Sequence, residues 1–314
     1  VDKAGNQGSS MQSDSIIIDL TNPAVEITSP EEGSWFKEDF IVSETDDDEN
    51  LLECQIEIQN NENEPYVSEW DSELCNADFN LILDSYCSED GTCKITKRAK
   101  DNSCKESEDN IIVNIDRTFP EVSKKVGEPK VEGWEWLQWI INWFITDETE
   151  ITLSCDDGEG RGEKEIKYRI NDGEFIEYEE PFSLPEEDGV YNLEYYCVDN
   201  MDIESENKIE TDKVDTQAPE TIKTIGEPKY WDEEKEQWCV SEVTLFNLIC
   251  DDEEVGCDKI YYEIDENGEQ TYSLPFTFGS DDYEDGEHTI YYHSVDLLGN
   301  SEETQSEEDF LDRT

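Results

Sequence analysis

Positive charge is scarce in this chain of 314 residues. Lysine and arginine together number 22, against 85 aspartate and glutamate residues, which gives a formal net charge of −63. A surface of this sign repels the phosphates of nucleic acids and of anionic membranes. The composition therefore argues against both as partners and favours cations.

Long apolar runs are also missing. The most apolar stretch, residues 136–145, is interrupted by Gln138 and Asn142 and is much shorter than the ~20 residues that a membrane helix needs. We therefore expect no membrane insertion within these residues.

Histidine, the commonest acid–base catalyst, occurs only at His288 and His293. These two residues are five positions apart in a segment with strand-like alternation, so they point to opposite faces, with His288 on the expected core face. The sequence contains no nucleophile-and-base motif and no phosphate-binding loop. We predict no catalytic residues and a protein that is not an enzyme.

The ten cysteines do not have the spacings of zinc sites, because no CxxC or Cys/His pair is present. This pattern indicates disulfides, and disulfides indicate an oxidising, extracellular compartment. A signal peptide, where the protein has one, is expected outside these residues. Aromatic residues make up 11% of the chain, which is too many for a disordered acidic segment and predicts a folded protein with an acidic surface.

A repeat is visible in the pattern DxxxP, which occurs at 19–23, 116–120 and 215–219. The chain ends Asp-Arg-Thr at 312–314, where a fourth such pattern would follow, so the starting aspartates are 97, 99 and 97 residues apart. The opening VDKAGN also returns as VDLLGN at 295–300. A fixed period of this length is typical of tandem repeats. We expect the tail of a preceding repeat in 1–20 and complete repeats in 21–117, 118–216 and 217–314, cut from a longer array.

Strand-like alternation fills each repeat, for example at 150–155, 191–197 and 260–264, and Asp-Gly, Asn-Gly and proline turns separate the segments. About seven short strands in ~98 residues is the pattern of an antiparallel immunoglobulin-like sandwich. The predicted fold is all-β, with three tandem immunoglobulin-like β-sandwiches in an elongated array after a terminal strand of another repeat.

The cysteines of repeats 2 and 3 fit this fold. Cys155 and Cys197 lie in the B and F strands, which an immunoglobulin sandwich joins by a disulfide. In repeat 3, Ser294 replaces the F-strand cysteine and Cys257 is gained shortly after Cys250, so we pair Cys250 with Cys257.

Repeat 1 has five cysteines, which allow several pairings. Cys87 and Cys93 bracket a hairpin turn and are predicted to pair, which leaves Cys54 to pair with Cys75. Cys104 of this repeat has no predicted partner in the chain.

Cys104 and Cys239 remain unassigned, and we expect them at opposite ends of the array. They are candidates for an intermolecular or long-range disulfide between successive units. The alternative is that both are free or paired differently.

The chain resembles the tandem Ig-like repeats of large bacterial and archaeal cell-surface proteins. The resemblance rests on the DxxxP linkers, on the C-D-D…G-C…I-Y-Y pattern at 250–262 and on the VDxxGN end of the F strand, and it covers nearly the whole chain. It implies an extracellular location at a cell surface. Such repeats serve as stalks, adhesins and filament walls, and fold alone does not decide between these roles.

We therefore predict a non-enzymatic structural component of an extracellular filament, fibre or stalk. Its expected partners are further copies of itself or neighbouring repeats of the same longer chain. The alternative is an adhesin that binds a surface glycan or protein.

Acidic residues recur where strands B and F end and where the linkers begin. In this sandwich these positions meet at one pole, so each joint between domains gathers an acid from the linker, the B–C loop and the F–G loop. Oxygen ligands in such numbers suit Ca²⁺, although solvated turn residues are the other interpretation. The candidate ligands are Asp19, Asp46, Asp47, Asp101, Asp116, Asp156, Asp157, Asp199, Asp215, Asp251, Asp252 and Asp296.

Two further segments are candidate contact sites. Trp134, Trp136 and Trp139 belong partly to an insertion in repeat 2 and either pack within the chain, bind glycan or contact a neighbouring subunit. The apolar strand Ser15, Ile16, Ile17 and Ile18 either belongs to a preceding domain or docks on another subunit by strand addition.

Overall fold

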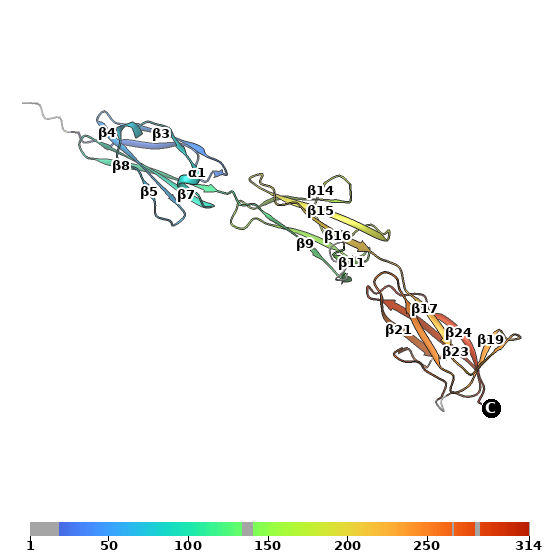
Figure 1. Ribbon diagram of the computed structural model, residues 1–314. Coiled ribbons are helices and arrows are strands. Elements are labelled where there is room, and N and C mark those ends of the chain that lie inside the picture. The colour runs from blue at the N-terminus through green and yellow to red at the C-terminus, as the bar shows by residue number, and fades with distance from the viewer. Residues whose placement is uncertain (1–18, 134–140, 266, 280–282, 314) are drawn as a thin grey trace, which may run out of the picture. The chain divides into compact units, whose positions relative to one another are not determined.

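The structure is a computed structural model that describes residues 19–133, 141–265, 267–279 and 283–313 (Figure 1). The chain forms two compact units. Unit 1 contains the described residues up to Phe119 together with the loops Asp157–Gly162 and Asp199–Ile203, and unit 2 contains the remaining described residues from Pro120 onward. The predicted donor strand, Ser15 to Ile18, lies outside the described residues.

The first sandwich consists of β1 (Ala24–Ser29), β2 (Trp35–Phe36), β3 (Phe40–Asp47), β4 (Leu51–Asn60), β5 (Tyr66–Val67), η1 (Ser72–Leu74), β6 (Phe79–Leu81), α1 (Leu83–Tyr86), β7 (Gly91–Asp101) and β8 (Glu106–Ile115). A three-stranded sheet, in the order β1-β3-β6, faces a five-stranded sheet, in the order β2-β8-β7-β4-β5. No helix in the described part of the chain is long and apolar enough to span a membrane.

The second sandwich consists of β9 (Glu121–Val126), β10 (Lys130–Glu132), β11 (Trp143–Ile145), β12 (Ile151–Asp156), β13 (Glu163–Ile170), β14 (Ile176–Glu177), β15 (Gly189–Asp199) and β16 (Lys208–Val214). Strands β9 and β12 form one sheet, and the other has the order β10-β11-β16-β15-β13-β14.

The third sandwich has the same plan. Its strands are β17 (Glu220–Ile225), β18 (Lys229–Asp232), β19 (Gln237–Val240), β20 (Phe246–Asp251), β21 (Cys257–Ile264), β22 (Gln270–Thr271), β23 (Gly286–Asp296) and β24 (Gln305–Leu311). Strands β17 and β20 pair, and the other sheet has the order β18-β19-β24-β23-β21-β22.

The prediction of all-β, immunoglobulin-like sandwiches is confirmed. In each sandwich a short strand runs parallel to the last strand, namely β2 to β8, β11 to β16 and β19 to β24, while the other described strand pairs are antiparallel. Each pair of sheets encloses its own apolar core, because alternate side chains of every long strand point inward.

Strand β23 shows this alternation and places His288 on the core face, as predicted. The His288 ring nitrogens lie 2.5 Å from an Asp265 carboxylate oxygen and 2.8 Å from the Glu284 carbonyl oxygen. Its polar atoms are thus satisfied within the sandwich, which is the arrangement of a structural histidine.

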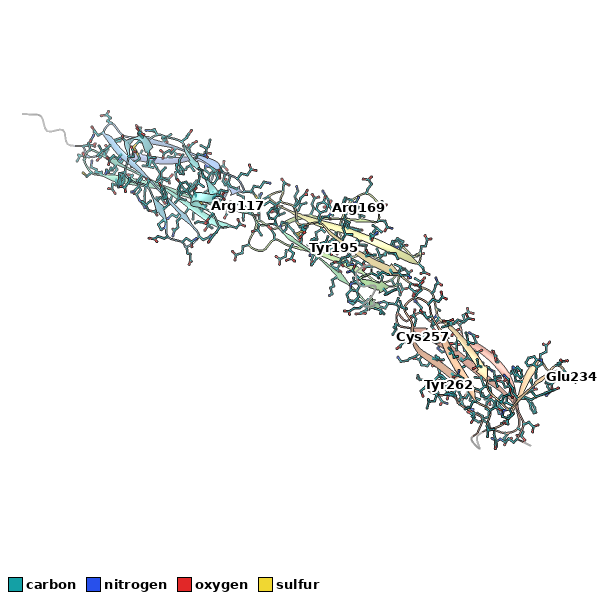
Figure 2. All side chains as sticks on the ribbon, viewed as in Figure 1. Arg117, Arg169, Tyr195, Glu234, Cys257 and Tyr262 are labelled. Atoms are coloured by element: carbon teal, nitrogen blue, oxygen red, sulfur yellow. A yellow bond between two sulfur atoms is a disulfide. The ribbon has the colours of Figure 1, made fainter. Side chains whose placement is uncertain are left out.

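Four disulfides join the pairs that the sequence analysis proposed: Cys54–Cys75, Cys87–Cys93, Cys155–Cys197 and Cys250–Cys257. In the second sandwich the bond links β12 to β15, and in the third it links β20 to β21, so each connects the two sheets. Figure 2 labels Cys257 on the third sandwich.

The two remaining thiols form no disulfide. Cys104 is exposed and Cys239 is half-buried. Burial, together with the nearby Asp232 carboxylate, raises the pKa of the Cys239 thiol and lowers its reactivity at neutral pH. The bond between chains stays a prediction.

The disulfides of the second and third sandwiches are expected to differ in their contribution to stability. Their cysteines are 42 and 7 residues apart, and chain entropy predicts losses of about 4 and about 2.5 kcal/mol when each pair is replaced by alanine. Hydrogen exchange in β15 and β23 of the two double variants measures the losses separately. A larger loss for the short loop would contradict this account.

Candidate metal centre

The next-to-last strand of each sandwich ends in a buried aspartate: Asp101 on β7, Asp199 on β15 and Asp296 on β23. In each, Oδ1 accepts hydrogen bonds from the backbone N–H groups two and four residues later. For Asp199 these donors are Met201 and Ile203, both at 2.7 Å. The recurring aspartate therefore folds the loop that follows the strand.

The linkers begin with three more aspartates, Asp19, Asp116 and Asp215. Oδ1 of each accepts the backbone N–H two residues later, at 3.0, 3.2 and 3.1 Å. The backbone N–H of Thr21, followed by its hydroxyl, lowers the pKa of Asp19 to about 2. Burial instead raises the pKa of Asp215. The DxxxP pattern is thus a turn motif that also places a carboxylate at the start of each linker.

Two of these acids meet a third aspartate in unit 1. Asp116 from the linker, Asp157 from the loop after β12 and Asp199 from the end of β15 each place one carboxylate oxygen within 4.8 Å of the others. All three residues are buried, with exposed fractions of 0%, 6% and 0%. This is the combination of linker, B–C loop and F–G loop that the sequence predicts.

Backbone groups satisfy only part of this cluster. Asp116 Oδ2 accepts the N–H of Arg161, and Asp157 Oδ2 accepts the N–H of Gly162, both at 2.7 Å. Asp157 Oδ1 and Asp199 Oδ2 are buried and accept no hydrogen bond from the described residues. Burial raises the pKa of Asp157, and the charges of Asp116 and Asp199 raise it further. A buried anion in this situation lacks a compensating positive charge.

Gly160 lets the loop approach the acids. A Cβ atom at this position would overlap the Asp157 carboxylate and would lie 2.9 Å from Asp116 Oδ1. The absence of a side chain here allows the two carboxylates to converge beneath the loop.

At the start of the first sandwich, a lysine lies beside the corresponding acids. Asp19, Asp48 and Asp101 form a second cluster within 4.8 Å. Lys105, four residues after Asp101, places its Nζ 3.5 Å from Asp19 and 3.8 Å from Asp101, and it also donates to the Thr21 carbonyl oxygen. The ammonium group supplies the positive charge from within the chain.

In unit 2, a side-chain amide donates hydrogen bonds to the corresponding acids. Asn300, four residues after Asp296, donates from Nδ2 to Asp296 Oδ2 at 2.8 Å and to the Asp215 carbonyl oxygen at 3.1 Å. This joint also has an apolar cluster formed by Ile141, Phe144, Val255 and Leu298. Asp215 Oδ2 is nevertheless buried and accepts no hydrogen bond from the described residues.

At the Asp116–Asp157–Asp199 cluster the equivalent position, four residues after Asp199, is Ile203, which offers no side-chain donor. Within the described chain, Asp157 Oδ1 and Asp199 Oδ2 therefore accept no hydrogen bond. Three desolvated carboxylates are a hard, anionic donor set of the kind that Ca²⁺ prefers, with further oxygens available from backbone carbonyls and water. Asp116, Asp157 and Asp199 would hold such an ion.

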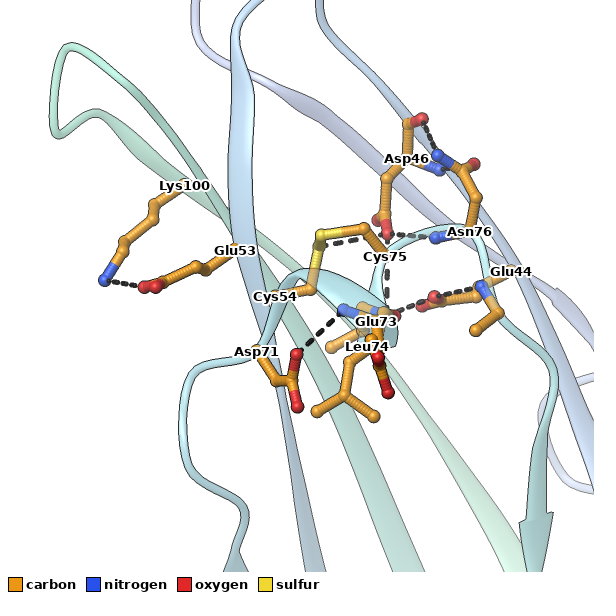
Figure 3. The surroundings of a disulfide bond; sticks show 12 residues. Glu44, Asp46, Glu53, Cys54, Asp71, Glu73, Leu74, Cys75, Asn76 and Lys100 are labelled. Carbon is orange, nitrogen blue, oxygen red and sulfur yellow. Dashed lines mark hydrogen bonds and ion pairs between the residues drawn. A yellow bond between two sulfur atoms is a disulfide. The ribbon is translucent and has the colours of Figure 1, made fainter.

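The structure does not bring Asp46 or Asp47 together with the linker and F-strand acids of the first sandwich. Strand β3 extends through Asp47, so Asp48 is the acid that reaches Asp19 and Asp101. Asp47 points to solvent, whereas Asp46 points inward and accepts the N–H of Asn76 at 3.1 Å. Figure 3 shows Asp46 and Asn76 beside the Cys54–Cys75 disulfide. Asp46 and these two cysteines form a further group of potential ligand atoms, but both sulfur atoms are in the disulfide, so thiolate ligation is excluded.

The structure does not bring Asp156 or Asp251 into such a cluster either. Each is the exposed last residue of its strand, β12 or β20, and neither belongs to a group of potential ligands among the described residues. Asp252 and Asp296 are close enough to Asp215 to raise its pKa, but within the described chain these three do not converge as the unit 1 acids do. The predicted patch of Trp134, Trp136 and Trp139 lies outside the described residues.

No family model matches this chain, and no curated protein matches it. Among solved structures it is similar to the fibronectin(III)-like modules of Clostridium thermocellum CbhA, with 18% identity over 61% of this chain and 94% of that chain and a TM-score of 0.28. It is also similar to a tetra-tandem repeat in the extending region of a large adhesion protein, with 14% identity over 93% and 74% of the two chains and a TM-score of 0.32.

A further similar structure is dimeric latent PorU from Porphyromonas gingivalis, with 11% identity over 95% of this chain and a TM-score of 0.23. This chain spans 35% of that one. The identities and TM-scores are too low to indicate a function, which is therefore inferred from the residues of this chain.

Calcium is expected to bind the cluster with a dissociation constant on the order of 10⁻⁴–10⁻³ M, the range of extracellular modules. Asp199→Asn keeps the oxygen that caps the loop but removes one charge, so it should weaken binding at least about tenfold, equivalent to ~1.4 kcal/mol. Isothermal titration calorimetry measures this. Glu159→Gln removes an exposed acid of the same loop and is the matched control. Equal affinities for the two variants would refute the assignment.

Without calcium, Asp157→Asn is expected to stabilise the protein at neutral pH. The pKa of Asp157 is higher in the folded than in the unfolded state, so protonation favours folding. The stability that protonated Asp157 contributes is full below the ordinary aspartate pKa of 3.8 and is lost as pH rises through the raised pKa. The advantage of the variant should therefore vanish on acidification. Thermal unfolding from neutral pH to about pH 4 tests this, and a constant difference would contradict it.

Proposed function

We propose that this chain is a structural segment of an extracellular assembly at a microbial surface, in which calcium fixes loops of the second sandwich to the linker of the first. The observation that carries the proposal is the buried Asp116–Asp157–Asp199 cluster. Its three acids come from three separate segments, and two of its oxygens accept no hydrogen bond from the part of the chain that the structure describes. An ion bound there would hold the three segments together.

The rest of the chain suits a structural role. Each sandwich has its own core and at least one disulfide, so each can fold as a unit. Arrays of this kind exert their function through length and through contacts between neighbours. The joints then decide how stiff the array is, and each joint in this chain has its own means of offsetting buried acid.

Calcium would act at the joint mainly by restricting motion. Without the ion, repulsion among the three carboxylates opposes packing of the two loops against the linker. With the ion, each carboxylate gains a shared partner, and binding to the folded state alone would add about 2.7 kcal/mol at a hundred times the dissociation constant.

An adhesin is the alternative function, and one feature of the third sandwich favours it. Strand β18 exposes Tyr230 and Trp231, with exposed fractions of 69% and 41%, and Trp231 contacts Trp238 of β19 edge to face. Exposed aromatic rings of this kind can bind a glycan or a protein. In that case Trp231→Ala should abolish binding of the ligand and leave calcium binding at the Asp116–Asp157–Asp199 cluster unchanged.

Negative-stain electron microscopy of the native full-length protein, with calcium and then with chelator, distinguishes the two functions. The structural proposal predicts ordered filaments or fibres that lose their order in chelator. The variant Ile203→Lys, which introduces the lysine found at the first joint, should keep order in chelator. Isolated rods with the same flexibility in both conditions would contradict the structural proposal and favour the adhesin.

A further inference from the structure

Outside the metal centre, the third sandwich buries a lysine between two acids. Lys223 of β17 places Nζ 2.7 Å from Asp309 Oδ2 and 2.7 Å from Glu307 Oε2, both on β24. The side chains of Lys223 and Asp309 are each 1% exposed. Tyr292 of β23 donates its hydroxyl hydrogen to the other oxygen of Glu307 at 2.9 Å. Asp309 Oδ1 is buried and has no hydrogen-bond partner among the described residues.

The second sandwich contains the same four residue types in the same places. Lys124 of β9 places Nζ 2.6 Å from Asp212 Oδ2 and 2.9 Å from Glu210 Oε2, both on β16. The side chains of Lys124 and Asp212 are 1% and 0% exposed. Tyr195, labelled in Figure 2, donates to the other oxygen of Glu210. The arrangement of tyrosine, glutamate, lysine and aspartate is thus built twice.

The first sandwich shows that the fold does not need this arrangement. Counted from the linker proline and the linker aspartate, the equivalent positions hold Ile27, Ile111 and Val113, all buried in the core. A buried ion pair is often no more stabilising than apolar residues of similar size. Stability alone therefore does not account for the two copies.

The geometry allows a condensation. We propose that Lys124 is joined to Asp212, and Lys223 to Asp309, by an amide bond between the lysine Nζ and the aspartate Cγ. In each case the neutral amine attacks the protonated carboxyl group, the Nζ–Cγ bond forms, a Cγ–O bond breaks and one water molecule leaves. Glu210 or Glu307 takes the amine proton and delivers it to the departing hydroxyl, so no other reactant is needed.

The surroundings favour the protonated form of each aspartate. Burial raises the pKa of Asp212 and of Asp309, although the adjacent lysine charge opposes this. Formation of the amide removes two desolvated charges, which are expensive to bury. The reacting groups are also held in contact by the two strands, which gives them a high effective concentration.

The bonds would connect the first and last strands of each sandwich, β9 to β16 and β17 to β24. A force applied through the two linkers would then act on a covalent bond rather than on the hydrogen bonds between strands. This inference does not depend on calcium and would hold equally for a stalk or an adhesin.

Intact mass spectrometry of the reduced, full chain tests the inference. The expected mass is lower than that of the sequence by two water molecules, and digestion should yield branched peptides that join Lys124 to Asp212 and Lys223 to Asp309. A full sequence mass after reduction, with both lysines in linear peptides, would overturn the inference.

Variants separate this reaction from other losses of water, such as cyclisation at Asp-Gly sequences. Lys223→Arg keeps the positive charge but cannot form the amide, so it should restore the mass of one water and leave the second sandwich as an internal control. A mass deficit unchanged by Lys223→Arg would overturn the assignment.

Glu307→Gln should slow formation of the bond in the third sandwich by ~10²–10⁴-fold, the usual contribution of a general acid–base group. Unchanged formation would refute the role of Glu307.

Discussion

The desolvated carboxylate is the constraint on which this structure depends. With 85 acidic residues against 22 basic ones, most acids of this chain have no lysine or arginine to pair with. Backbone N–H groups satisfy one oxygen of most of the buried aspartates at the strand ends and linkers, because the loops fold around Oδ1. The second carboxylate oxygen of these aspartates does not accept those backbone hydrogen bonds, and the group that lies nearest to it differs from one joint to the next. At the first joint the Lys105 ammonium lies 3.8 Å from Asp101 Oδ2. In unit 2, Asn300 donates to Asp296 Oδ2, while Asp215 Oδ2 accepts no hydrogen bond from the described residues. At the cluster of Asp116, Asp157 and Asp199 we infer a calcium ion.

The same constraint operates inside the sandwiches, where a buried lysine sits beside acids in each of the three. In the second and third, Lys124 and Lys223 lie between an aspartate and a glutamate of the last strand. In the first, Lys97 contacts Glu44, whose pKa burial raises to about 7 despite the nearby ammonium group. Buried carboxylates therefore occur both at the joints and inside the sandwiches, and neighbouring repeats offset their charge with different residues.

Much of the fold could be predicted from the sequence, because the repeat period, the alternation and the cysteine positions all reflect local rules. The grouping of Asp116, Asp157 and Asp199 followed from topology, since the ends of strands B and F and the linker must share a pole. The positions of Asp46 and Asp47 could not be predicted, because β3 extends through Asp47 and so turns one acid inward and the next outward. The role of position 203 could not be predicted, since it depends on which side chain reaches across the joint. The Tyr–Glu–Lys–Asp arrangement could not be predicted, because its members are far apart within each repeat and no local pattern indicates that they meet in the sandwich interior.

Crystallography of the chain grown with calcium, with anomalous diffraction recorded, tests the central claim most directly. The account predicts one anomalous peak among the carboxylates of Asp116, Asp157 and Asp199, with ligand distances of about 2.3–2.6 Å, and none beside Lys105 or Asn300. A structure in which the three carboxylates are bridged only by water or by protein groups, at saturating calcium, would contradict it.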